Sequence, residues 1–164
     1  MRFAPAAAAL SLFLATTASV TSADDAKPDP RAELLLTQGK AALAAGETQA
    51  AIDAFEAALV VDPAYTPIFV QLAEAARQDG LQGKAIRYYR EALERDPGNF
   101  AAISGEGEAL VEKGALEKAK RNLARLESLC GASCPETVAL QTTIAKGPPA
   151  RLAADTPDET AASN

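Results

Sequence analysis

Two cysteines, Cys130 and Cys134, are the residues of this chain best suited to covalent chemistry. Three alternatives are open for them: a structural disulfide, free or mixed thiols, or a redox-active or soft-metal site. Their spacing is not the C-x-x-C of thioredoxin-like proteins, and two cysteines without histidine cannot complete a tetrahedral zinc site. We expect a disulfide that fixes a C-terminal helix, because the chain also begins with an export signal and disulfides persist in oxidising compartments.

Four carboxylates form the second group that could carry chemistry: Glu106, Glu108, Glu112 and Glu117. Paired acids can catalyse proton transfer or bind a cation. The chain has no Asp-rich loop of the calcium-binding type, so we expect a solvated acidic face.

Several classes of site are excluded by composition. There is no His, which removes Ser-His-Asp and Cys-His nucleophile systems and imidazole metal sites. Gly105 and Gly107 follow no strand, so we expect close helix packing there and not a phosphate loop. With a net charge of −6, the chain is poorly suited to nucleic acid. We therefore expect no catalytic residue, no metal and no cofactor.

Residues 1–23 have the pattern of a secretory signal peptide. Met1-Arg2 give a positive start, residues 3–15 are apolar, and small residues lead to a cleavage site after Ala23 or Ser22. The apolar run is short for a hydrocarbon core of about 30 Å, so an uncleaved anchor is the lesser alternative. We expect secretion across the inner membrane, a periplasmic location in a Gram-negative cell, and no stable membrane insertion after cleavage.

The middle of the chain repeats with a period of 34 residues. Asp62-Pro63 recurs as Asp96-Pro97, and Gly46 recurs as Gly80 and Gly114. Such a period is typical of stacked supersecondary units. Apolar residues within each unit recur at spacings of three and four, which indicates helices, and each unit is divided by its glycine into two helices.

Small and large residues alternate at equivalent positions of the units. The small positions are Gly39, Ala73 and Gly107 and also Ala51, Ala85 and Ala119, whereas the large position holds Phe55, Tyr89 and Leu123. A small residue lets two helix backbones approach, and a bulky one fills the adjoining gap. Because one helix pair cannot bury its apolar face alone, the units must stack.

These residues resemble the tetratricopeptide repeat (TPR) family, whose pattern is W-x₂-L-G-x₂-Y, then A-x₃-F, then P. The first unit matches at Leu35, Gln38, Gly39, Ala42, Ala51, Phe55 and Pro63, and the second at Phe69, Leu72, Ala73, Ala76, Ala85, Tyr89 and Pro97. The third matches at Ile103, Gly107, Leu110, Ala119 and Leu123, but has Glu106 at a core leucine position and Gly131 in place of the final proline.

The resemblance implies an all-α fold: a short right-handed solenoid of three helix pairs plus a C-terminal capping helix. We expect a signal peptide at 1–23, a flexible lead at 24–30, and a TPR-like domain at 31–146. Within that domain the repeats are 32–65, 66–99 and 100–133, and the cap helix is 134–146, opened by a capping box from Ser133 to Glu136. Residues 147–164 are expected to be a disordered acidic tail.

In the family the first helix of each pair lines a concave groove. Carried over by position, the groove residues are Leu36, Lys40, Leu43, Val70, Glu74, Arg77, Ser104, Glu108, Val111 and Glu112. This surface would be apolar upstream and acidic downstream. For the apolar members, packing within the array is an equal alternative. The carboxylate clamp of chaperone-binding members is not expected, because Leu36, Gln71 and Gly105 stand at its positions.

The function that follows is a non-catalytic, exported scaffold that holds a peptide or helix of another protein in this groove. The acidic part would favour a partner with a basic segment. Two alternatives remain open: thiol-redox chemistry at Cys130 and Cys134, and a structural role in self-association through an imperfectly capped end.

Overall fold

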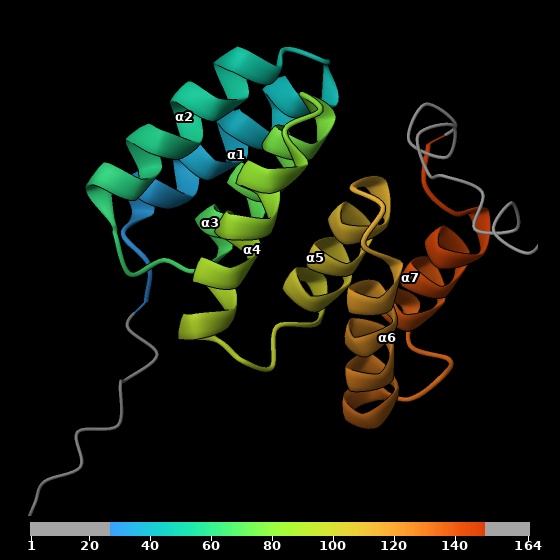
Figure 1. The fold of residues 1–164 in the computed structure, drawn as a ribbon. Helices are drawn as coiled ribbons and strands as arrows, with labels where there is room; N and C mark the ends of the chain where they lie inside the picture. The colour runs from blue at the N-terminus through green and yellow to red at the C-terminus, as the bar shows by residue number, and fades with distance from the viewer. Residues whose placement is uncertain (1–26, 150–164) are drawn as a thin grey trace, which may run out of the picture.

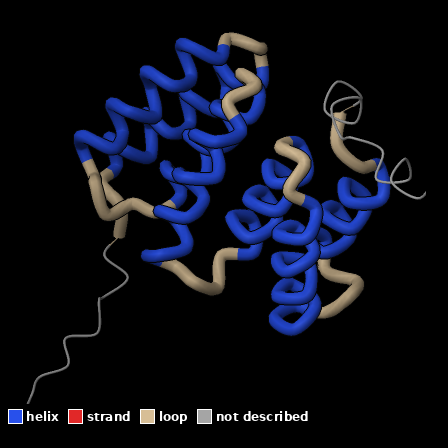
Figure 2. The backbone as a smooth tube through the Cα atoms, in the orientation of Figure 1, coloured by secondary structure: helices blue, strands red, loops and turns tan. Residues whose placement is uncertain are grey.

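The computed structural model describes residues 27–149, and every regular element in that part of the chain is an α-helix. Residues 1–26 and 150–164 lie outside the described part, and so do the predicted signal peptide and most of the predicted tail. The helices form three antiparallel pairs followed by a seventh helix (Figure 1). Figure 2 shows the same path with short loops between the helices.

Each repeat supplies one helix pair. The bounds are α1 Pro30–Ala44 and α2 Thr48–Val61, α3 Pro67–Gln78 and α4 Gln82–Arg95, α5 Phe100–Glu112 and α6 Leu116–Cys130, and finally α7 Pro135–Lys146. The all-α solenoid of helix pairs predicted from the sequence is therefore confirmed.

The 34-residue signals lie where the helices end. Gly46, Gly80 and Gly114 have positive φ angles and lie in the turn inside each pair, a conformation that costs a glycine little. Asp62 and Asp96 cap α2 and α4 at their C-terminal ends, and the prolines that follow them cannot continue a helix.

The core alternates small and large side chains as predicted. Ala51, Ala85 and Ala119 are all fully buried. A side chain at Gly39 would overlap the Phe55 ring, and a side chain at Gly105 would overlap the Tyr89 ring. The Gly105-x-Gly107 segment is thus a close-packing segment on α5 and not a phosphate loop.

The seventh helix closes the array. Its buried face is Thr137 and Leu140, both fully buried, with Ile144 partly buried beside them. Gly107 lies directly beneath Leu140. Val138 lies off this face and is 47% exposed, because it is one residue, or about 100°, away from Thr137 around the helix.

The predicted capping box is wrong. Cys134, and not Ser133, is the N-cap of α7, and no side chain bonds to the free N–H groups there. Pro135 takes the first helical position, where its fixed φ suits a helix start and its missing N–H costs nothing.

Candidate protein-binding groove

The first helices of the repeats, α1, α3 and α5, line one side of the array, and α7 continues that row beside α5. Of the ten residues predicted to line the groove, six reach the surface at least in part: Lys40, Val70, Glu74, Arg77, Glu108 and Glu112. A partner can touch these six side chains, and Ser104, although buried, lines a pocket described below.

Leu36, Leu43 and Val111 are instead core side chains, exposed by 4%, 8% and 0%. A first helix is covered by its own partner helix and by the next repeat, so little of its circumference is free. These three residues therefore pack within the array, which is the alternative that the sequence left open, and the upstream half of the groove has no apolar lining from Leu36 or Leu43.

Arg77 organises the acidic half of the groove. Its Nη2 atom lies 3.0 Å from Glu108 Oε2 and 2.7 Å from Glu112 Oε1, and its Nη1 lies 3.4 Å from Glu74 Oε1. Two of these carboxylates belong to α5 and the third to α3, so one guanidinium joins the second repeat to the third. Three carboxylates share one cation, which leaves the network negative.

Tyr89 extends this network into the core. Its hydroxyl donates to Glu74 Oε1 at 2.6 Å. Burial, and then the neighbouring Glu74 carboxylate, raises the pKa of Tyr89 well above its ordinary value. Burial alone would lower the pKa of Arg77, but the hydrogen bond to Glu112 and the charges nearby outweigh it, so the pKa is raised. The phenol stays neutral and the guanidinium charged.

Beside this network lies a pocket of about 300 Å³ that we call the acidic pocket. It is lined by Glu74, Ala101, Ser104, Gly105, Glu108, Pro135, Glu136 and Ala139. Ser104, itself buried, has its hydroxyl 3.1 Å from Glu108 Oε1 and 3.1 Å from the backbone oxygen of Glu136. The lining therefore comes from α3, α5 and α7, and it combines three carboxylates with small or apolar residues.

The contribution of α7 to this pocket was not predicted from the sequence. The 34-residue period itself could have indicated it. One period after Ile103, Glu106 and Leu110 come Thr137, Leu140 and Ile144. The helix is therefore in register as the first helix of a fourth repeat, and not only a cap.

The other acidic residues do not converge on one site. Glu106 is buried, where Arg90 Nε contacts it at 2.7 Å and Asn122 Nδ2 donates to it at 3.0 Å. Glu117 is exposed and pairs with Lys120, which lowers its pKa. Of the four carboxylates, one is therefore buried in the core, two lie in the groove, and one lies on the exposed surface.

Cys130 and Cys134 are joined by a disulfide, with Cα atoms 5.7 Å apart. The bond ties the last residue of α6 to the N-cap of α7. Glu136 lies close enough for its carboxylate to join both sulfurs in a group with metal-ligand spacing. Disulfide sulfurs are not thiolates, however, and thiolates are what metals and exchange reactions require.

Tetratricopeptide-repeat family models match residues 36–100 and 76–128, together more than half of the chain. The chain contains tetratricopeptide repeats. The matched residues lie within the three helix pairs α1 to α6. Within residues 27–149, no helix has both the length and the hydrophobicity needed to span a bilayer.

Solved TPR structures share this fold. The Sgt2 TPR domain from Aspergillus fumigatus has a TM-score of 0.66 and 28% identity, over 83% of this chain and 94% of that one. The Yersinia enterocolitica secretion chaperone SycD, in complex with a peptide of the translocator YopD, has a TM-score of 0.61 and 24% identity, over 70% of this chain and 86% of that one. The first TPR domain of human RPAP3 has a TM-score of 0.64 and 22% identity, over 71% of this chain and 91% of that one. A comparison with curated protein sequences found no match.

Proposed function

We propose that this chain is a non-catalytic scaffold that binds a peptide or helix of another protein across α3, α5 and α7. The observation that carries the proposal is the acidic pocket, whose lining combines small or apolar residues with Glu74, Glu108 and Glu136. Such a site fits a Lys or Arg side chain, whose stem is apolar and whose head is charged. Proteins of similar fold have been solved with bound peptides, including SycD with a YopD peptide.

The charge of the groove distinguishes this proposal from recognition of an acidic chain end. RPAP3 has been solved with the HSP90 peptide SRMEEVD, which ends in acidic residues. Here one guanidinium serves three carboxylates, so a peptide of that charge would be repelled.

A crosslinking experiment tests the groove. A photoreactive amino acid at Ala101, an exposed residue of the acidic pocket, is compared with the same group at Lys118, on α6 and outside that pocket. We expect one defined partner adduct from position 101, weakened when Glu108 is replaced by Gln. Equal adducts from both positions would contradict groove binding.

We also propose that the protein is exported, with residues 1–23 removed, and is periplasmic in a Gram-negative cell. The support is the n-region, apolar region and small-residue order of this segment. Cell fractionation followed by N-terminal sequencing tests it. The expected first residue is Asp24 or Ala23, and an intact Met1 in the cytoplasmic fraction would rule export out.

A further inference from the structure

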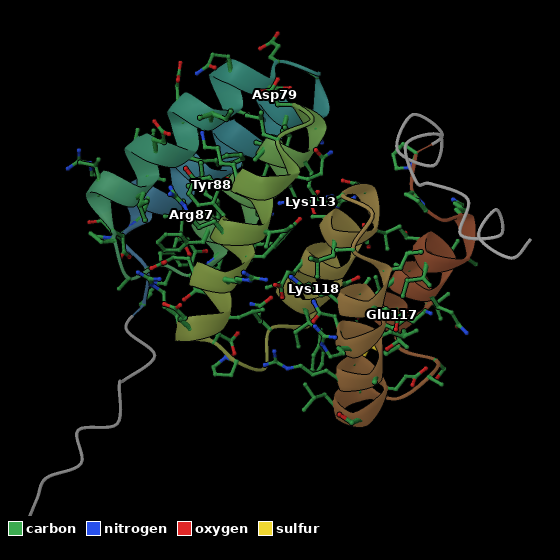
Figure 3. The ribbon with its side chains drawn as sticks, in the orientation of Figure 1. Asp79, Arg87, Tyr88, Lys113, Glu117 and Lys118 are labelled. Atoms are coloured by element: carbon green, nitrogen blue, oxygen red, sulfur yellow. A yellow bond between two sulfur atoms is a disulfide. The ribbon has the colours of Figure 1, made fainter. Side chains whose placement is uncertain are left out.

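The second helix of the second repeat presents an aromatic ring flanked by cations. Tyr88 on α4 has Lys84 Nζ 5.7 Å from its ring centroid and the Arg87 guanidinium 5.9 Å from it. Lys84 precedes Arg87 by three residues and Tyr88 by four, so its side chain neighbours both on the helix surface. Figure 3 shows Arg87 and Tyr88 on the side of α4 nearest α2.

A pocket of about 390 Å³ opens at this face, and we call it the aromatic-cation pocket. Phe69, Arg87, Tyr88 and Glu91 line it. The Arg95 guanidinium lies 4.2 Å from the Phe69 ring centroid and also pairs with Glu91. Phe69 is only 6% exposed and lies under Arg95, so the ring that the pocket offers is that of Tyr88, and the pocket's own carboxylate is already paired.

Two cations at this pocket have no partner of opposite charge. Among the described residues, neither Lys84 nor Arg87 lies within 4.0 Å of a carboxylate. Helix α4 carries four cations and two carboxylates, whereas the chain as a whole is acidic at −6. The aromatic-cation pocket therefore has an excess of positive charge, although the chain as a whole is acidic.

We propose that the aromatic-cation pocket docks an acidic segment of a partner protein. An Asp or Glu carboxylate of that segment pairs with Arg87 and Lys84, and a neighbouring aromatic or large aliphatic side chain packs against the Tyr88 ring. A guanidinium binds a carboxylate with charge-assisted hydrogen bonds, and the ring provides the apolar area that such contacts lack. This surface is separate from the acidic pocket and prefers the opposite charge, so it goes beyond the function proposed above.

The test uses a short fluorescent peptide with Phe between Glu residues, its Gln-for-Glu analogue and its Ala-for-Phe analogue. Binding to the full chain is followed by anisotropy at low salt, and the site is mapped by amide chemical shifts. We expect the Phe–Glu peptide to shift resonances of α4 and Phe69, and both analogues to bind about tenfold more weakly. Raising the salt concentration should weaken binding.

Matched variants locate the interaction. Arg87→Gln and Lys84→Gln should each weaken the peptide several-fold, because they remove charge from partly exposed side chains without opening the core. Lys118→Gln, an exposed cation of α6 on the same side of the molecule (Figure 3), should leave binding unchanged.

Three results would overturn the proposal. One is that the Gln-for-Glu analogue binds as tightly as the Phe–Glu peptide. Another is that the amide chemical shifts change only at residues of the acidic pocket. The third is a gain in affinity when residues 150–164 are removed, because the chain's own acidic segment, and not a partner, would then be the occupant. The first and third outcomes do not bear on crosslinking at Ala101, whereas the second would also count against the preference of the acidic pocket for a basic segment, so the crosslinking result distinguishes failure of one proposal from failure of both.

Discussion

Gly105 is the residue whose substitution tests the helix packing most directly. A methyl group there would overlap the Tyr89 ring of the preceding repeat, and Tyr89 is itself fully buried. We expect Gly105→Ala to lower the free energy of unfolding by about 1–3 kcal/mol, measured by urea denaturation. Gly83→Ala is the matched control, since its methyl group would meet only the end of the Lys113 side chain. That change should be neutral or stabilise by about 0.5–1 kcal/mol, and equal losses in the two variants would contradict the packing described.

The raised pKa of Tyr89 predicts that the protein becomes less stable at alkaline pH. Its pKa is raised in the folded state by burial and by Glu74, so its stabilising contribution is complete below the ordinary pKa near 10. Above that pH the unfolded chain releases the phenol proton while the folded chain retains it, and stability falls as pH rises. We expect Tyr89→Phe to be less stable at pH 8, because its hydrogen bond is lost, but to show a shallower decline between pH 10 and 11. Parallel declines in wild type and variant would refute the assignment.

For Glu106 the sequence predicted the position in the repeat but not the side chains that pair with it. The repeat register identified it as a departure at a core leucine position, and the structure buries it. Its partners, Arg90 on α4 and Asn122 on α6, depend on how three helices meet. A sequence period fixes which residues are equivalent, but it does not fix the distances between side chains of different repeats.

At the scale of one element, α7 is expected to contribute stability through a single buried leucine. Leu140 is fully buried over Gly107, whereas Val138 on the same helix is half-exposed. Leu140→Ala should therefore cost about 2–5 kcal/mol by leaving a cavity, and Val138→Ala within about 0.5 kcal/mol. Thermal or urea denaturation of both variants distinguishes them. Equal effects would mean that α7 is not docked by this face.

The Cys130–Cys134 disulfide is expected to fix the start of α7. It closes a loop of only a few residues, so the chain-entropy gain is about 2 kcal/mol. We expect the double variant Cys130→Ser, Cys134→Ser to fold and to lose about that amount. Hydrogen exchange should then rise first at the N-terminal turn of α7. A thiol-redox function, the alternative that the sequence left open, instead requires ready exchange with a glutathione buffer, and resistance to that buffer would exclude it.

The elements themselves were largely predictable because their signals are local. Prolines, turn glycines and spacings of three and four act within a few residues, and all three helix pairs were found from them. The start of α7 was misplaced because two local signals competed: the Ser133-to-Glu136 pattern, and Pro135 at the first helical position. Pro135 prevails, so that Cys134 becomes the N-cap.

At the scale of the whole molecule, the net charge conceals a separation of charge. Helix α5 carries three carboxylates and no cation, whereas α4 and α6 each carry four cations and two carboxylates. Composition alone indicated an acidic protein with a basic partner. The helix arrangement instead yields two regions of opposite sign, and this could not be inferred before each charged residue was placed on a face.

Arg77 links the second repeat to the third, so its replacement should lower both the stability and the cooperativity of the whole array. Arg77→Gln leaves Glu74, Glu108 and Glu112 close together without their shared cation, so we expect a loss of about 2 kcal/mol in the free energy of unfolding. The network spans α3 and α5, so without it the second and third repeats should unfold less cooperatively. The urea transition should therefore broaden, with a lower m-value. Adding Glu112→Gln removes part of the repulsion, so the double-mutant cycle should give a coupling energy of at least about 0.5 kcal/mol. Lys120→Gln, which breaks an exposed pair within α6, should change neither the midpoint nor the slope. Additive effects of Arg77→Gln and Glu112→Gln would show that the two side chains act separately and that the repeats are held together by their apolar contacts alone.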